Sequence, residues 1–218
     1  MSNYVLKYRR GEEVKYISHL DFVRFIHRVM RRVNLPMEYS QGFNPHPIMT
    51  VAMPLSVGVT SDCEYMKIGI VGDNDEQFIK DTINNGMPPG FEILDVRKDV
   101  DKSYDFKKLS RAEYIVDIET NTDISIDEFL KNKTLNVMKK SKSGIKEADI
   151  RPHIFSIEKL EFSDGGLKLK MILSAGNEYN LKPDTVIDAM KLYIEGFLPT
   201  FYTVHRNRML TKDNKVLL

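Results

Sequence analysis

The order of strand-like and helix-like segments constrains the fold of this 218-residue chain more than any other feature of its sequence. Helices are indicated by apolar residues three and four positions apart, and strands by short runs rich in β-branched and aromatic residues. Residues 3–98 follow the order β-α-β-β-α-β, with one further extended piece, VKYI, before the first helix. The expected strands are NYVLKYRR, IMTVAMPL, EYMKIGIVG and FEILDVRKDV, and the expected helices are residues 18–34 and NDEQFIKDTINNG.

A similar order recurs after residues 99–109, a polar stretch with the composition of a linker. The expected elements are AEYIVDIE (strand), SIDEFLKN (helix), TLNVMKKS (strand), KSGIKE (turn), ADIRPHI (extended), FSIEKLEF and LKLKMILS (a hairpin across SDGG), KPDTVIDAMKLYI (helix) and FYTVHRNRML (strand). The sequence therefore predicts an α+β chain of two ferredoxin-like units in tandem, residues 1–98 and 110–218, with antiparallel sheets. The second unit is expected to carry an inserted β-hairpin.

Composition excludes several classes of protein. With 42% hydrophobic and 29% charged residues, the chain can bury a core and is not globally disordered. No apolar run approaches the roughly 18 residues of a membrane span, and the N-terminus has no signal-peptide pattern. We therefore expect a cytoplasmic protein without membrane segments. The single cysteine, Cys63, excludes a cysteine-ligated iron–sulfur cluster within this chain, and we expect no metal and no cofactor in it.

The net charge of +1 conceals two basic segments. Residues 1–50 contain eight Lys or Arg against four Asp or Glu, a net of +4. Residues 131–151 contain seven against two, a net of +5. A nearly neutral protein with such segments can still present a basic face to an anionic partner.

The first helix combines an apolar stripe with an arginine face. Ser18 and Asp21 have the spacing of a capping box at its start, and Pro36 ends it. The residues expected to face the core are Val23, Ile26, Met30 and Val33. The basic residues are Arg24, Arg28, Arg31 and Arg32, of which the first three share one face. Guanidinium groups match phosphate oxygens, so contact with an anion or RNA is favoured over pairing with acids of neighbouring elements.

Two histidines in this helix have open roles. His19 follows Ser18 at the helix start, where it could donate to a phosphate or pack beneath the following loop. His27 falls between the apolar stripe and the arginine face, so we expect a boundary position rather than a catalytic one.

The segment SQGFNPHP, residues 40–47, is the most unusual stretch of the chain. Gly42 permits a backbone conformation closed to other residues, and two prolines hold His46 between them. Phe43 could serve as a lid or as a platform for stacking on a base. We predict that this loop contacts a ligand; the alternative is that it only turns a corner.

The second half offers further basic candidates for a phosphate-binding surface. They are Lys139, Lys140 and Lys142 in the basic segment, Arg151 before a proline, and Arg206 and Arg208 near the C-terminus. A solvated turn is the equally weighted alternative for the lysines.

The segment YISHLDFVRFIHRVMRRVNLPMEYSQGFNPHPIMTVAMPLSVGVTSDCEYMKI resembles the DUF2344 family, as does KKSKSGIKEADIRP. The shared features are the Ser-His-Leu-Asp helix start, the Ser-x-Gly-Phe-x-Pro-His-Pro loop, Ala-x-Pro-Leu, and a basic turn leading to Asp-Ile-Arg-Pro. Members of this family occur fused to, or encoded beside, a radical-SAM protein. This chain lacks the Cys-x3-Cys-x2-Cys cluster motif of that partner, so the resemblance implies a stand-alone accessory protein.

The leading functional hypothesis is an accessory RNA-binding module that partners a radical-SAM enzyme acting on RNA or a ribosome-related target, with catalysis in the partner. One alternative is a metal-independent endoribonuclease that uses His19 or His46 as acid or base. Another is a protein-interaction scaffold that binds no nucleic acid.

Overall fold

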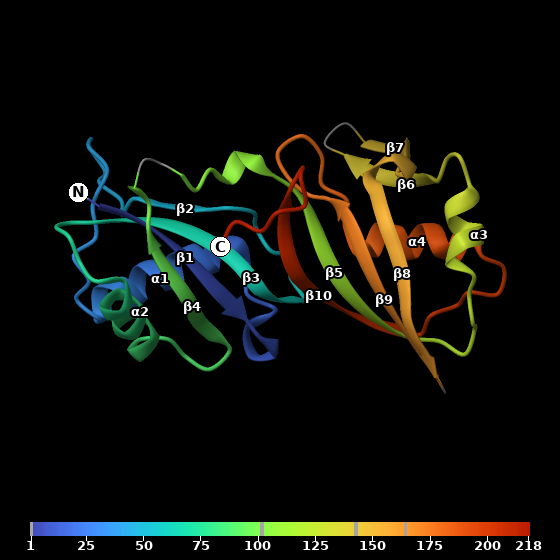
Figure 1. Ribbon diagram of the computed structural model, residues 1–218, viewed down its shortest axis with the longest axis horizontal. Helices are drawn as coiled ribbons and strands as arrows, with labels where there is room; N and C mark the ends of the chain where they lie inside the picture. Colours follow the sequence, from blue (N-terminus) through green and yellow to red (C-terminus); the bar gives the residue numbers. More distant parts are fainter. Residues whose placement is uncertain (1, 101–102, 142–143, 164) are drawn as a thin grey trace. The chain divides into compact units, whose positions relative to one another are not determined.

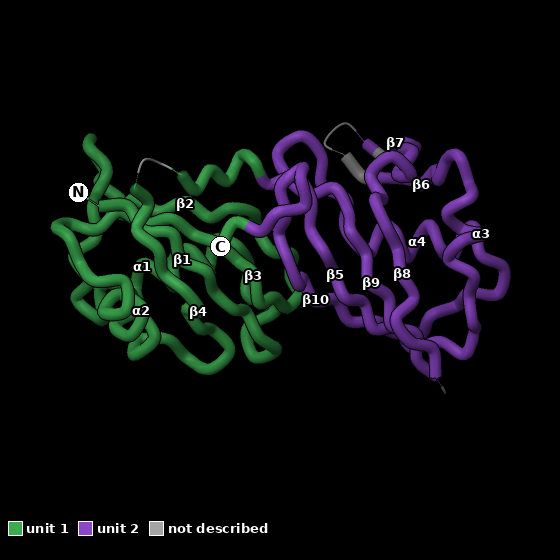
Figure 2. Tube along the Cα trace, in the orientation of Figure 1, with its two compact units in different colours: residues 1–108, 217–218 green, residues 109–216 purple. Residues whose placement is uncertain are grey.

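The computed structural model describes residues 2–100, 103–141, 144–163 and 165–218 (Figure 1). The chain forms two compact units: unit 1 comprises residues 1–108 with 217–218, and unit 2 comprises residues 109–216 (Figure 2). Each unit combines an antiparallel sheet with α-helices, so the predicted α+β class is confirmed. None of the helices in the described ranges is long and apolar enough to cross a membrane.

Unit 1 is a sheet covered on one face by two helices. Its elements are β1 (Ser2–Arg10), α1 (His19–Arg32), β2 (Met49–Val51), β3 (Val59–Ile70), α2 (Glu76–Asn85) and β4 (Phe91–Lys98), with the short 3-10 helices η1 (Glu12–Val14) and η3 (Phe106–Lys108). Strand β1 lies between β4 and β3, β2 pairs with β3, and all these pairings are antiparallel. Both helices contribute to one apolar core with alternate residues of β1, which places them on the same face of the sheet.

The prediction that VKYI is extended is wrong, because this part of the chain forms a turn. The helix η1 ends on the first residue of this segment, Val14. The buried Arg10 side chain donates hydrogen bonds to three backbone carbonyls, those of Val14, Lys15 and Ile17. Carbonyls gathered around one guanidinium cannot also form a regular strand ladder. The turn brings the chain to the start of α1.

Helix α1 begins where the sequence predicts. The Ser18 side chain accepts from the backbone N–H of Asp21 at 3.2 Å and donates to its carboxylate at 2.7 Å. The buried residues of the helix are Phe22, Ile26, Val29 and Met30, whereas Val23 and Val33 are only partly buried against the same core. The apolar stripe is therefore rotated slightly from the predicted one, because Phe22 fills the space between Tyr8 (ring centroids 5.2 Å apart) and Phe91 (5.5 Å).

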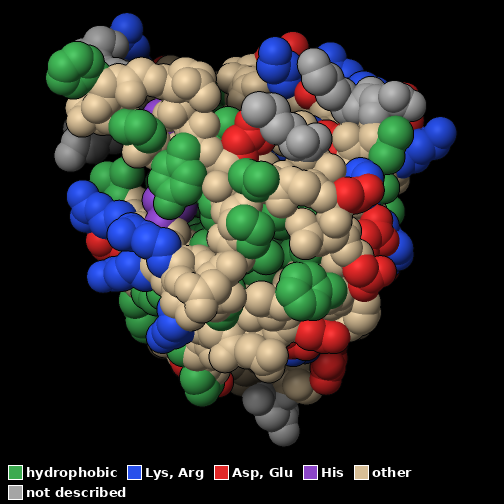
Figure 3. Space-filling model, turned by 90° about the vertical axis from the view of Figure 1, so that its left-hand side faces the viewer, with side chains coloured by type: hydrophobic (Ala, Val, Ile, Leu, Met, Phe, Trp, Pro, Cys, Tyr) green, Lys and Arg blue, Asp and Glu red, His purple; other side chains and the backbone are tan. Residues whose placement is uncertain are grey.

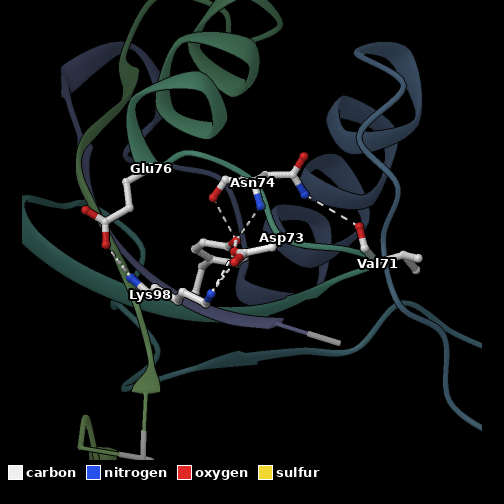
Figure 4. Close-up of polar contacts among 6 residues, drawn as sticks. Val71, Asp73, Asn74, Glu76 and Lys98 are labelled. Atoms are coloured by element: carbon white, nitrogen blue, oxygen red, sulfur yellow. Dashed lines mark hydrogen bonds and ion pairs between the residues drawn. The ribbon is translucent and has the colours of Figure 1, made fainter.

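A polar network fixes the start of α2 against β1 and β4 (Figure 4). The hydroxyl of the buried Tyr4 donates to the Asn74 carbonyl at 2.8 Å and accepts from the Asn74 N–H at 2.9 Å. The Lys98 ammonium lies 2.7 Å from both carboxylate oxygens of Asp73, and Glu76 accepts from the Lys98 N–H at 2.7 Å. The pKa of Asp73 is lowered, most by the hydrogen bond from Lys98 and next by the hydrogen bond from Tyr4.

Unit 2 contains four neighbouring antiparallel strands and a separate hairpin. Its elements are β5 (Leu109–Glu119), α3 (Ile126–Lys131), β6 (Asn136–Ser141), β7 (Gly144–Asp149), the 3-10 helix η4 (Arg151–His153), β8 (Ile154–Ser163), β9 (Gly166–Ser174), α4 (Pro183–Tyr193) and β10 (Phe201–Thr211). The strands follow the order β10-β5-β9-β8 and all pair antiparallel. Helix α4 lies behind β8 and β9 in Figure 1. Strands β6 and β7 form a two-stranded sheet by themselves.

Two local predictions for unit 2 are wrong. Residues 144–147 of the segment KSGIKE, expected to be a turn, are the first four residues of β7, which pairs with β6 from Asn136↔Asp149 to Ser141↔Gly144. Residues 142–143 of that segment lie outside the described residues. The segment ADIRPHI is not extended throughout, because η4 interrupts it where Pro152 presets a helical φ angle. The hairpin expected across SDGG does form, between β8 and β9.

The core position of Ile26 can be tested by truncation. Ile26 is fully buried, so Ile26→Ala should lower the free energy of unfolding by about 2–5 kcal/mol through lost burial and a residual cavity. Leu20, 66% exposed on the same helix, is the matched control, and Leu20→Ala should change that energy by about 0.5 kcal/mol or less. Urea denaturation followed by circular dichroism measures both variants. Equal losses in the two would contradict the described packing of α1.

Candidate nucleic-acid interface

The arginine face of α1 points away from the core of unit 1. Arg24, Arg28 and Arg31 are all exposed. Arg24 lies 3.4 Å from the Asp21 carboxylate, and both side chains are more than 60% exposed, so this pair holds the guanidinium only weakly. Arg28 and Arg31 make no hydrogen bond or ion pair with any residue that the structure describes. The face therefore offers guanidinium groups that the protein itself does not neutralise.

Arg32 differs from the other three arginines. Its guanidinium donates to the backbone carbonyl of Gly86, at the C-terminal end of α2. This contact joins the ends of the two helices. Arg32 therefore has a structural partner, although its side chain is exposed.

The loop of residues 40–47 is closed at its base. Tyr39 and Pro47 form an isolated antiparallel bridge, and the Ser40 N–H donates to the His46 carbonyl at 2.9 Å. The Ser40 hydroxyl accepts from the His46 N–H at 3.1 Å and lies 2.9 Å from His46 Nδ1. Gly42, with φ +127°, supplies the left-handed conformation at the tip. The side chains that the loop presents therefore stand on a constrained backbone.

Two side chains project from this loop into solvent. Phe43 is fully exposed, at 105% of its reference area, so nothing in the chain covers its ring. His46 is also exposed, and its Nε2 makes no hydrogen bond within the described part of the chain. Because Ser40 and Asn44 contact only Nδ1, the outer nitrogen of a fixed imidazole remains available.

His27 lies at the boundary between the core and the arginine face, as its sequence position predicts. The ring is half-buried and its Nε2 is buried without a hydrogen-bond partner among the described residues. Burial of the ring is the main cause that lowers the pKa of His27, and repulsion from Arg31 and from His46 adds to it. The loop therefore comes within electrostatic reach of α1. Sequence reasoning missed the influence of His46 on His27, and no local signal indicated it. The influence of Arg31 had a signal, because it lies four residues after His27 on the same helix.

The side chains of this region form a mixed surface. Figure 3 shows a face on which Lys and Arg side chains gather beside histidine side chains, with hydrophobic side chains next to both. His19, the first residue of α1, is half-buried. A surface with cations, imidazoles and an exposed aromatic ring can bind phosphate groups and stack on bases at once.

The basic candidates of β6 are partly engaged by the protein. The Lys139 ammonium lies 4.2 Å from the centroid of the Tyr179 ring and donates to the Asn180 carbonyl at 3.4 Å. The Lys140 side chain and the whole of Lys142 lie outside the described residues.

Arg151 anchors the hairpin to the rest of unit 2. Its guanidinium donates to the carbonyls of Leu130 at 3.2 Å and Ile154 at 3.1 Å. Asp149 accepts from the N–H groups of Leu135 and Arg151, and these two hydrogen bonds lower the pKa of Asp149. The Asp-Ile-Arg-Pro stretch thus holds the two ends of the β6–β7 hairpin together.

The two arginines of β10 have different surroundings. Arg206 is only 4% exposed, which leaves its guanidinium little surface for a ligand. Arg208 is 59% exposed and its Nε lies 3.8 Å from a Glu113 carboxylate oxygen. Of this pair, Arg208 is the one that a ligand can reach.

The electrostatic coupling between His27 and Arg31 predicts a pKa change. Arg31→Gln removes a positive charge that disfavours the imidazolium, so the pKa of His27 should rise toward its ordinary value of about 6.5. Histidine NMR signals followed from pH 4 to 8 measure it, and Arg24→Gln is the matched control because Arg24 does not contribute to the lowered pKa. The same rise in both variants would contradict the specific role of Arg31.

The same lowered pKa has a consequence for stability. The unfolded state binds a proton at His27 more readily than the folded state, so the ring favours folding above the unfolded pKa of about 6.5. That contribution is lost as the pH falls through the folded-state pKa.

Comparison with solved structures shows a shared fold at low identity. A chain in the crystal structure of a Cbf5–Nop10–Gar1 complex superposes with a TM-score of 0.52 and 11% identity, over 94% of this chain and 48% of that chain. A chain in an H/ACA RNP bound to a substrate RNA containing 2′-deoxyuridine gives a TM-score of 0.50 and 11% identity, over 94% and 47%. This chain thus spans about half the length of the chains it matches. A search of curated proteins finds no match.

A comparison of the sequence with protein-family models identifies the family of this chain. Residues 3–183 match the sequence model of DUF2344, an uncharacterized protein conserved in bacteria. The matched range contains all of α1, the loop of residues 40–47 and the Asp-Ile-Arg-Pro stretch, and it covers far more than half of the chain. This chain therefore belongs to the DUF2344 family.

Proposed function

We propose that this chain is an RNA-binding module, and that its contact surface is the arginine face of α1 together with the loop of residues 40–47. The observation that carries the proposal is the pair Arg28 and Arg31, exposed and without protein partners in the described ranges, in the same unit as a fully exposed Phe43. RNA offers both matching chemistries, phosphates for guanidinium groups and unpaired bases for an aromatic ring.

The fold adds support by analogy. One structure that shares the fold is described as an H/ACA RNP bound to a substrate RNA, and the other as a complex of Cbf5, Nop10 and Gar1. At 11% identity this likeness concerns the fold, and function has to be argued from the side chains. The analogy therefore supports RNA as a partner, but it does not identify the residues that bind RNA.

We assign both units to the ferredoxin-like class. The sheet orders β4-β1-β3-β2 and β10-β5-β9-β8 support the assignment, with β6–β7 as the inserted hairpin of the second unit. The proposed domains are residues 1–98 and 110–218, joined by 99–109.

A radical-SAM enzyme is the proposed protein partner, on the strength of the family resemblance alone. In that arrangement the partner performs the chemistry and this chain delivers or holds the RNA. A cytoplasmic location belongs to the same proposal.

Loss of the arginine face should weaken RNA binding. The triple variant Arg24→Gln, Arg28→Gln, Arg31→Gln should bind single-stranded RNA less tightly, and the slope of log affinity against log salt should fall by about 0.7 for each lost phosphate contact. Fluorescence anisotropy at several salt concentrations measures both quantities. RNA integrity is checked in the same samples, since cleavage would favour the endoribonuclease alternative with His19 or His46.

A matched control removes the same charge elsewhere. Lys159, Lys168 and Lys170 each lie within 3.0 Å of a carboxylate in unit 2. Their triple replacement by Gln should leave RNA affinity closer to that of the parent chain. Equal weakening in both triple variants would mean that net charge alone, and not the α1 face, governs binding.

Phe43 should contribute by stacking. Phe43→Ala should weaken binding of a single strand by about 1–3 kcal/mol, the typical contribution of one base on an aromatic ring. Phe43→Trp should retain affinity, whereas Phe43→Leu, still apolar but not aromatic, should lose it. The thermal midpoint should stay constant in all three because the side chain is fully exposed. Affinity that survives in the leucine variant would show a hydrophobic contact instead of stacking.

A further inference from the structure

The β6–β7 hairpin of unit 2 sets two lysines directly against each other (Figure 1). In the register of this two-stranded sheet, Lys139 lies opposite Lys146. Directly opposed residues of an antiparallel pair have Cβ atoms about 4.5–5.5 Å apart, and like charges in that position destabilise the pair. The register therefore makes the hairpin less stable than an acidic residue at either position would.

The lysines of β9, in the same unit, have the opposite surroundings. Lys168 lies opposite Asp117 of β5 and Glu161 of β8, and its ammonium is 3.0 Å from the Asp117 carboxylate. Lys170 lies opposite Glu158 of β8, with 2.5 Å between ammonium and carboxylate. The lysines of β9 are therefore matched with carboxylates across the strands, whereas the two hairpin lysines are matched with each other.

Neither hairpin lysine is neutralised by the part of the chain that the structure describes. The Lys139 ammonium lies 4.2 Å from the centroid of the Tyr179 ring and donates to the Asn180 carbonyl at 3.4 Å, and both of these groups are uncharged. Lys146 is exposed and makes no hydrogen bond or ion pair with any described residue. One ammonium is thus held in place with its charge intact, and the other can turn toward a ligand.

We infer that Lys139 and Lys146 form a docking site for a phosphodiester backbone. A lysine ammonium binds phosphate as a point charge and does not require the planar geometry that a guanidinium does. Phosphates supply the negative charge that the register lacks, so their binding relieves repulsion between the lysines as well as adding attraction. Contacts to the backbone position a nucleic acid without reading its sequence. This inference goes beyond the proposed surface in unit 1 and rests on the proposed function only for the choice of RNA as the polyanion.

A pair of double variants tests the site through the salt dependence of binding. Lys139→Gln with Lys146→Gln should lower the slope of log affinity against log salt for an oligouridylate by about 0.7 for each lost phosphate contact. Lys168→Gln with Lys170→Gln removes the same charge from the same unit, and this matched control should change the slope less. Fluorescence anisotropy measures both. An equal fall in the two double variants, or no fall in the hairpin variant, would overturn the inference.

Reversal of one charge separates a binding role from a structural one. Lys146→Glu places a carboxylate opposite Lys139, so the thermal midpoint should stay constant or rise. RNA binding should nevertheless weaken, and more than in Lys146→Gln, because the new carboxylate repels phosphate and neutralises Lys139. The Lys146 side chain is exposed and has no partner among the described residues, so folding does not depend on it. RNA affinity that stays at the parent level in Lys146→Glu would contradict the site.

His153 reports on the charge of Lys139 in the unmodified chain. Burial of the ring is the main cause that lowers the pKa of His153, the Lys139 ammonium adds to it, and Asp149 acts in the opposite direction. Lys139→Gln should therefore raise this pKa, and so should an oligouridylate that docks on Lys139 and offsets its charge. Histidine NMR signals followed against pH measure both changes. A His153 that responds to Lys139→Gln but not to RNA would place the RNA elsewhere and overturn the inference.

Two comparisons separate this inference from its neighbours. An oligoglutamate of the same charge as the oligouridylate should bind more weakly, and equal affinity with an equal loss in the hairpin variant would assign the site to an acidic protein instead. If the triple variant of α1 loses RNA affinity and the hairpin variant does not, this inference fails and the proposed function stands. If only the hairpin variant loses affinity, the proposed surface on α1 fails and the hairpin site remains.

Discussion

The apolar contact between α1 and the sheet of unit 1 sets the orientation of every basic side chain on this helix. Phe22, Ile26, Val29 and Met30 are buried against the sheet, and each contributes roughly 1.5–3 kcal/mol relative to exposure. A surface ion pair such as Arg24–Asp21 contributes at most about 1 kcal/mol. Burial therefore decides the rotation of the helix, and the arginines take the face that remains. A helix held in this way is a fixed support for a binding surface.

The loop of residues 40–47 presents its side chains by a different means. Backbone and side-chain hydrogen bonds between Ser40 and His46 close it, and two prolines restrict the chain on either side of the histidine. A fully exposed Phe43 gains none of the roughly 1.5–3 kcal/mol that burial of such a ring provides. Constraint of the backbone limits the entropy lost when a ligand covers the ring. The loop is thus suited to contact something outside the chain.

The basic segment of unit 2 shows how similar sequence signals acquire different roles. Arg151 binds two carbonyls, Lys139 lies over Tyr179, and Tyr179 in turn stacks on His153 with ring centroids 3.4 Å apart. These contacts hold the β6–β7 hairpin against its own unit. In α1, by contrast, Arg28 and Arg31 have no such partners within the described residues. Basic residues cluster in both segments, but their side chains differ in how far the protein itself already engages them.

The sequence by itself determined the features that depend on local periodicity and capping: the α+β class, the limits of α1, the hairpin across SDGG and the exposed arginine face. It also placed His27 correctly at the edge of that face. It could not show that Arg10 turns VKYI away from a strand, or that KSGIKE continues a hairpin, because those outcomes depend on partners distant in the chain or across a turn. The influence of His46 on the pKa of His27, and the burial of Arg206, were likewise decided only by the tertiary structure. The physical reason is that periodicity reports which face of an element is buried, whereas the electrostatics of a site depend on which elements then meet.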